Sequence, residues 1–202
     1  AIGVRIEHPQ TLIDRARWGA AAGHPRLGAA EYKLVHHCQA GVQTGRAVYS
    51  FCMCPGGLVV AATSEPGCVV TNGMSQHSRN ERNANSGLVV PIERQDLEPW
   101  GRFPGDPLAG IAFQRHWEQR AFVAGGSDYR APAQWVDDFL ARRPSEDLSE
   151  QRTVHPLRGS YQPGLRLTSL DDCLPELVCE ALREALPAFE RRIPGYIGPD
   201  SL

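Results

Sequence analysis

The segment formed by residues 48–54 constrains the fold of this chain more than any other feature. Small side chains alternate along it with larger ones, in the order Val48, Tyr49, Ser50, Phe51, Cys52, Met53 and Cys54. A period of two predicts a β-strand with a small-residue face and a large-residue face. Turn sequences follow at Pro55-Gly56-Gly57, Pro66-Gly67 and Asn72-Gly73. With strands expected at 58–63 and 68–71, these turns predict a three-stranded antiparallel meander.

The remainder of the first half adds further strands and one long polar segment. We expect the strands at residues 1–6, 31–38 and 87–92. Residues 75–86 are rich in Asn and Arg and offer little to bury, so we expect an exposed loop whose amides and guanidinium groups suit polar ligands.

The second half has a helical pattern. Phe113, Trp117 and Ala121 recur at helical spacing, and residues 174–186 form a continuous apolar stripe. Residues 142–164, between these helices, read as an exposed linker. We therefore predict an α+β fold in which a β-rich portion, 1–98, packs with a helical portion, 99–202, of the same domain.

Composition excludes several classes of function. No apolar run approaches the ~18 residues that a membrane span needs, and a formal net charge of −2 gives no general attraction to nucleic acid or to an anionic membrane. The six cysteines have no secretory signal before them. We therefore expect reduced thiols and a cytoplasmic location. The chain starts within an apolar stretch without an initiator Met, so we also expect it to be part of a longer protein.

Cys52 and Cys54 are the first candidates for chemistry. Strand alternation predicts that they share a face about 6.6–6.8 Å apart, the outer limit for a disulfide. Two thiols beside Gly56 and Gly57 suit a redox or substrate-facing edge, because glycine permits close approach of a ligand to the backbone. The alternative is that both cysteines are small buried residues of a tightly packed sheet face.

Metal binding has weaker support from the sequence. His36, His37 and Cys38 are zinc-type ligands, but the two histidines point to opposite faces of a strand, and no C-x2-C or H-x3-H spacing occurs. We therefore expect no metal site. His8 lies beside Glu7, which can orient its imidazole, although a structural role is the alternative. No glycine-rich dinucleotide-binding turn is present.

Five ordered segments carry a resemblance to a known family. They are VRIEHPQ (4–10), AAEYKL (29–34), YSFCMCPGG (49–57), VTNGMS (70–75) and NANSGLVV (83–90). Together with later segments such as FQRHWEQRAF (113–122), they resemble a bacterial family of uncharacterised FAD-dependent dehydrogenases. The resemblance implies that this chain is the central region of such a protein, with its flavin-binding segments upstream and downstream and absent here.

The resemblance also implies a function and a set of site residues. It implies an oxidoreductase that uses FAD in the full-length protein, with NAD(P)H as a possible reductant, and a substrate-side chain that holds no cofactor alone. Its expected partners are the missing FAD-binding segments and a small-molecule substrate. The catalytic candidates are Cys52, Cys54 and His8. The flavin- or substrate-facing candidates are Gly56, Gly57, Arg5, Asn72, Asn83 and Asn85.

Two other functions remain open from the residues alone. One is a thiol- or zinc-based module, and the other is a non-catalytic interaction domain that uses the Trp117 and Trp135 helices as a partner surface.

Overall fold

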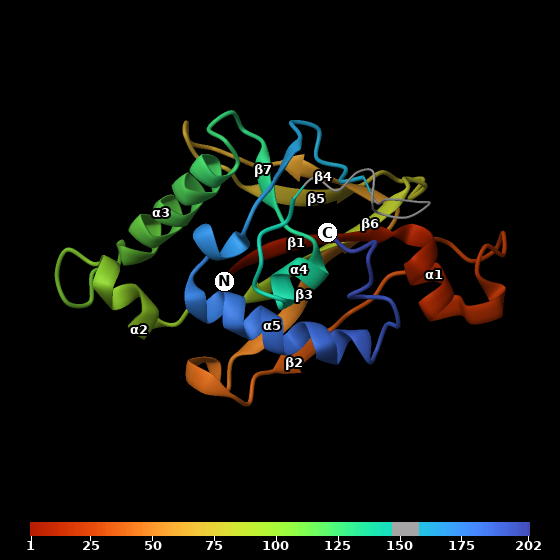
Figure 1. Ribbon diagram of the computed structural model, residues 1–202, viewed down its shortest axis with the longest axis horizontal. Helices are drawn as coiled ribbons and strands as arrows, with labels where there is room; N and C mark the ends of the chain where they lie inside the picture. Colours follow the sequence, from red (N-terminus) through yellow and green to blue (C-terminus); the bar gives the residue numbers. More distant parts are fainter. Residues whose placement is uncertain (147–157) are drawn as a thin grey trace.

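The computed structural model describes residues 1–146 and 158–202, in which helices cover a four-stranded sheet and two strand pairs flank it (Figure 1). The strands are β1 (Ile2–Pro9), β2 (Val35–His37), β3 (Ala47–Cys54), β4 (Gly57–Ala61), β5 (Thr71–Ser75), β6 (Asn83–Val90), β7 (Ala131–Ala133) and β8 (Leu165–Leu167). The α-helices are α1 (Gln10–Trp18), α2 (Arg94–Leu97), α3 (Ala109–Ala124), α4 (Val136–Leu140) and α5 (Glu176–Glu190). Short 3₁₀ turns are η1 (Gly19–Ala21), η2 (Gly41–Gln43), η3 (Glu98–Trp100) and η4 (Leu170–Asp172).

The main sheet has the strand order β1-β6-β3-β2, and every neighbouring pair in it is antiparallel. One face of this sheet, which we call the helix face, carries Ile6, Val48 and Leu88, and these side chains share a hydrophobic core with Leu182 of α5. Helix α5 can cover the face because its apolar residues recur at helical spacing along one side. The largest core therefore joins the first and last parts of the chain.

The opposite face, which we call the polar face, carries Arg5, Glu7, Asn83 and Asn85. The register explains this arrangement, because β1 and β6 place Arg5 opposite Gly87 and Glu7 opposite Asn85, and side chains alternate along a strand. The β4–β5 pair lies over this face, on the side of β1 away from α5 (Figure 1). The polar residues are thus enclosed between two layers of strands.

The α+β class is confirmed, but the predicted meander is wrong. Strand β3 pairs with β6 and β2, whereas β4 pairs only with β5, in a separate sheet. The cause is an irregularity at the end of β3. Its register with β6 shifts between Phe51 and Cys54, and Cys52 adopts a positive φ of 44°. A bulge of this kind bends a strand, and the turn at Gly56 then directs the chain into the second layer.

Two further predictions about the β-rich half are corrected. Asn72 and Gly73 do not form a turn but lie in the middle of β5. The predicted loop at 75–86 is shorter, because β5 ends at Ser75 and β6 begins at Asn83. Amide side chains usually favour turns, yet here they lie on strands because the neighbouring layer supplies their hydrogen-bond partners.

The predicted linker, 142–164, lies partly outside the described residues. Most of its described residues are exposed, as predicted, but two of them are buried. Ser145 is buried and its hydroxyl donates a hydrogen bond to Asp138 at 2.7 Å, while Tyr161 is buried beside Val59 and Ala131 in a second, smaller core. Among residues 1–146 and 158–202, no helix combines the length and the apolar character that crossing a membrane requires.

Candidate functional site

Arg5 is the centre of a polar cluster on the polar face. Its Nη1 donates hydrogen bonds to the Cys52 carbonyl oxygen and to Asn85 Oδ1, both at 2.9 Å, and its Nη2 donates to Asn72 Oδ1 at 2.8 Å. The partners come from β3, β6 and β5, and Arg5 itself is on β1. Four of the residues singled out from the sequence therefore meet at one point. We call Arg5, Cys52, Asn72 and Asn85 the Arg5 cluster.

The charge of Arg5 is not neutralised within the described part of the chain. All three acceptors are neutral oxygens, and no carboxylate there forms an ion pair with Arg5. A guanidinium has five N–H donors, so Nε–H and one Nη2–H have no partner among these residues. Asn85 is fully buried, and its Nδ2 also has no partner there. The cluster therefore combines a fixed positive charge with spare donors.

Apolar and thiol groups surround this charge on the exposed side. Phe51 lies opposite Gly87, which lies opposite Arg5, so a residue without a side chain separates the ring from the guanidinium. Phe51 is 55% exposed, and Cys52 is the exposed cysteine of the six. Met74 of β5 is also exposed. A planar, partly apolar anion fits the chemistry of this surface.

Glycine at position 73 makes the close approach of the layers possible. A Cβ at Gly73 would collide with Asn85 Oδ1 and with the Arg5 guanidinium. The predicted glycines serve a different purpose. A Cβ at Gly56 would meet the Arg79 backbone, and one at Gly57 would meet Met74 O. Gly56 and Gly57 therefore allow other segments of the chain to pack closely against them. The sequence had predicted that a ligand would occupy this space.

Cys54 does not share the position of Cys52. The expected common face is lost at the bulge, where Cys52 turns to solvent while Cys54 stays buried. The Cys54 thiol donates weakly to the Cys52 carbonyl oxygen, at 3.2 Å. Both thiols are free, so the exposed chemistry of the pair belongs to Cys52.

His8 lies on the other side of the sheet from the Arg5 cluster. It is fully buried, its ring packs on Tyr196 at 4.4 Å, and Nε2 donates to the Tyr196 carbonyl oxygen at 2.9 Å. Burial lowers the pKa of His8 to about 4, although the Tyr196 carbonyl and the Glu190 charge favour the protonated form. The structure thus places this catalytic candidate in the core, apart from the exposed groups.

Asn83 belongs to a separate buried network around Glu7. Its Nδ2 donates to Glu7 Oε1 at 3.0 Å and to the Arg158 carbonyl oxygen at 2.9 Å. Ser160 donates to the same carboxylate from both its hydroxyl and its backbone N–H. Sequence reasoning missed Ser160, because nothing near it in the chain indicates a partner 153 residues away.

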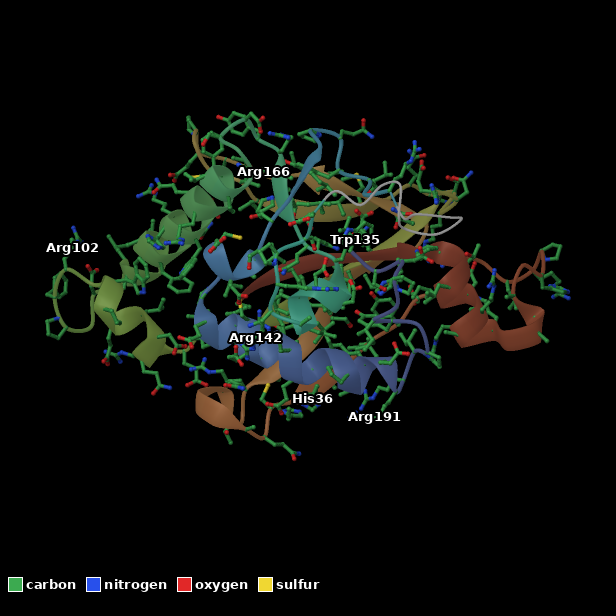
Figure 2. The ribbon with its side chains drawn as sticks, viewed as in Figure 1. His36, Arg102, Trp135, Arg142, Arg166 and Arg191 are labelled. Carbon is green, nitrogen blue, oxygen red and sulfur yellow. The ribbon has the colours of Figure 1, made fainter. Side chains whose placement is uncertain are left out.

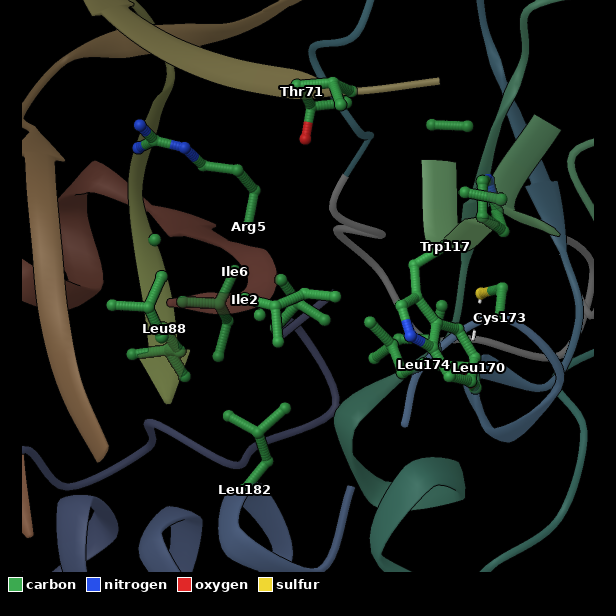
Figure 3. A pocket seen from close by; sticks show the side chains of 18 of the residues that line it. Ile2, Arg5, Ile6, Thr71, Leu88, Trp117, Leu170, Cys173, Leu174 and Leu182 are labelled. Carbon is green, nitrogen blue, oxygen red and sulfur yellow. Dashed lines mark hydrogen bonds between the residues drawn. The ribbon is translucent and has the colours of Figure 1, made fainter. Parts of the chain in front are cut away.

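An apolar cavity of about 680 Å³ lies between the edge strand β1 and α3, and residues of both faces of the sheet line it (Figure 3). Ile6 and Leu88 lie on one side of it, and Trp117 and Cys173 lie on the other. The stem of Arg5 borders the cavity while its guanidinium points away from Trp117 (Figure 3). Cavities of this size commonly hold small molecules.

Trp117 of α3 gives this cavity a buried hydrogen-bond donor. Its Nε1–H is buried and has no hydrogen-bond partner within the described residues. Trp135, by contrast, is 7% exposed and belongs to the interior. The expectation of a partner surface built on both tryptophans is therefore wrong for Trp135.

Comparison with known proteins yields one family and one relative. The model of a family described as "FAD-dependent protein, C-terminal domain-like" matches residues 1–202. A protein of Clostridium beijerinckii, described as an uncharacterized protein, is 47% identical over 202 residues, which is all of this chain and 35% of that relative's length. These matches cover this chain alone, so the flavin-binding segments expected upstream and downstream of it both stay predictions.

Proposed function

This chain belongs to the "FAD-dependent protein, C-terminal domain-like" family, and from that premise we propose that it forms the substrate-side domain of an FAD-dependent oxidoreductase of the dehydrogenase type. The single observation that carries the proposal is the Arg5 cluster. A guanidinium held by three neutral oxygens from three strands presents a net positive charge in a fixed place.

The Arg5 cluster fits a flavin edge. Bound FAD would supply the electron-transfer chemistry, and protein charges near its pyrimidine edge tune its electronics. The spare Nε–H and Nη2–H donors of Arg5 suit the oxygen and nitrogen acceptors of that edge, which become more negative on reduction. Asn72 and Asn85 hold the guanidinium in place, and Phe51 offers an apolar surface beside it.

The cavity beside Trp117 suits the body of a small-molecule substrate. Its lining is mostly apolar, and an apolar environment strengthens an electrostatic contact at its edge. The buried Trp117 Nε1–H can donate to one acceptor of the substrate and so fix its orientation. Cys52 does not line this cavity, but it is the thiol exposed to solvent, and we assign it to contact with substrate or flavin.

The remaining parts of the proposal follow from the resemblance and the composition. The chain's partners are the FAD-binding segments of its own longer protein, NAD(P)H serves as the reductant, and the protein works in the cytoplasm. These parts do not depend on the geometry of the Arg5 cluster.

The test measures the midpoint potential of flavin bound to the full-length protein. Arg5→Gln removes the positive charge and is expected to lower the potential by about 30 mV or more, since 30 mV corresponds to ~1.4 kcal/mol for a two-electron couple. Arg5→Lys keeps the charge and is expected to lie closer to wild type. Arg26→Gln is the control, because Arg26 is exposed and its side chain forms no hydrogen bond or ion pair among the described residues.

Two outcomes contradict the proposal in different ways. A full-length protein that purifies without flavin rejects the FAD-dependent function for this protein as a whole. If the protein does contain flavin but Arg5→Gln and Arg26→Gln have the same midpoint potential, the FAD-dependent function stands. The Arg5 cluster is then not the flavin-facing edge.

A further inference from the structure

A group of three metal-ligand types lies on the helix face, away from the Arg5 cluster. His36 Nε2, Cys38 Sγ and a carboxylate oxygen of Glu184 are all within 4.8 Å of one another. The His36 and Glu184 atoms are 3.1 Å apart. Figure 2 shows His36 beside α5 at the edge of the molecule. These residues come from two elements that are far apart in the chain.

Local structure explains why the three side chains converge. His36 and Cys38 are two residues apart at β2, so they point to the same side, and His37 points to the other. That side faces α5, where Glu184 projects from the edge of the apolar stripe. Gln39 N–H donates to Glu184 Oε1 at 2.7 Å, which fixes the carboxylate against the end of the strand.

One oxygen of this carboxylate, Oε1, takes the contacts to His36 and Gln39, and the second oxygen, Oε2, takes neither. Glu184 Oε2 is buried and accepts no hydrogen bond of good geometry within residues 1–146 and 158–202, although the backbone N–H of Ala40 also helps to lower the pKa of this carboxyl. A buried acceptor without a well-placed donor is unfavourable, and more so when it carries a charge. A cation would satisfy it. The side chains of His36 and Glu184 are 20% and 23% exposed, so an ion and a water molecule can reach the group from solvent.

We propose that His36, Cys38 and Glu184 bind one divalent metal ion of the zinc class. His36 Nε2, Cys38 Sγ and a Glu184 oxygen are the protein ligands, and water completes a four-coordinate site. Imidazole, thiolate and carboxylate are the ligands that Zn²⁺ takes, at about 2.0–2.3 Å in tetrahedral geometry. The Cys38 thiol releases its proton to solvent when the sulfur ligates the ion.

The site would connect β2 at the edge of the sheet to α5. Metal binding to the folded state alone stabilises it by mass action, so the ion would fix the last helix on the sheet. This inference departs from the expectation of no metal site, and it does not depend on the proposed flavin function. Sequence spacing could not reveal it, because Glu184 is 148 residues from His36.

The test compares zinc binding by the full-length protein and its variants after reduction and removal of metals. Each protein is equilibrated with Zn²⁺ and gel filtered, and bound zinc is measured by elemental analysis. Wild type is expected to retain one more equivalent than His36→Ala or Cys38→Ala, and Glu184→Gln is expected to bind that equivalent at least ~10-fold more weakly. Zn²⁺ is also expected to raise the midpoint of thermal unfolding of wild type and to leave that of His36→Ala and Cys38→Ala unchanged.

His37→Ala is the matched control, because His37 is the exposed neighbour on the other side of β2. It is expected to bind zinc as wild type does. Circular dichroism shows whether each variant is folded. If Cys38→Ala does not fold, the comparison of zinc binding by His36→Ala and wild type decides the test. Equal zinc retention by wild type and His36→Ala overturns the proposal, as does a loss of zinc that is the same in His36→Ala and His37→Ala.

Discussion

At the scale of single residues, burial decides which titratable groups meet solvent. Six cysteines and a histidine beside a glutamate made several residues chemically plausible. The structure exposes only Cys52 among the thiols. Burial is the leading cause that raises the pKa of Cys173 and of Cys179 to about 12, so both remain protonated and unreactive near neutral pH. Burial also lowers the pKa of His8 to about 4, so its imidazole is neutral near pH 7.

His8 gives the protein a predictable loss of stability in acid. Its pKa falls from 6.5 to about 4 on folding, so the unfolded chain binds a proton where the folded chain does not. The stability that neutral His8 provides is complete above pH 6.5 and is lost as the pH falls toward 4, by up to about 3 kcal/mol. We expect His8→Asn to flatten this pH dependence, measured as the free energy of unfolding in urea at several pH values.

The control for this prediction is His37→Asn, which replaces an exposed imidazole on β2. It is expected to leave the slope of stability against pH as in wild type. His8→Asn will also lower stability at pH 7, because a smaller side chain leaves a gap beside Tyr196, so the slope and not the absolute value is the diagnostic quantity. An unchanged slope in His8→Asn would contradict the assignment.

At the scale of elements, the meeting of β1, β5 and β6 creates the Arg5 cluster. The decisive position is Gly73, where any side chain would occupy the space of the Arg5 guanidinium and Asn85. We expect Gly73→Ala to lower the free energy of unfolding by roughly 1–3 kcal/mol, because the added methyl group forces the two layers apart. Chemical denaturation measures this change.

Gly28→Ala is the matched substitution for Gly73→Ala. Gly28 has no neighbour within 4 Å of an added Cβ and no positive φ, so alanine there is expected to be neutral or slightly stabilising. If the two variants are equally stable, the layers have room for a side chain at position 73 and the Arg5 cluster is looser than described.

At the scale of the whole molecule, one core joins both ends of the chain. Leu182 of α5 is 1% exposed and packs in the same cluster as Ile6 and Leu88. We expect Leu182→Ala to destabilise the protein by about 2–5 kcal/mol. Because the core is shared, strand and helix signals are expected to be lost in one cooperative transition, followed by far-ultraviolet circular dichroism and tryptophan fluorescence.

Leu108→Ala serves as the comparison, since Leu108 is 50% exposed and its truncation removes little buried surface. It is expected to change stability by less than ~1 kcal/mol. Separate transitions for the two signals would contradict this expectation. They would show that the portions 1–98 and 99–202 unfold independently, as two stable units.

Sequence by itself determined the type of most elements. Alternation placed β3, and a helical stripe placed α5, because these periodicities follow directly from backbone geometry and burial. The motif that contains Cys52 and Gly56 and the segments around Arg5 and Asn85 also indicate the family. Each of these inferences depends on residues close together in the chain.

Tertiary structure decided how those elements pair and which candidates meet. The bulge at Cys52 separates two cysteines that alternation joins, and it sends the chain into a second layer of strands. The second layer in turn brings Asn72 to Arg5, while α5 brings Glu184 to His36. Such contacts span 67 and 148 residues, and they arise from packing between layers, which no local pattern encodes.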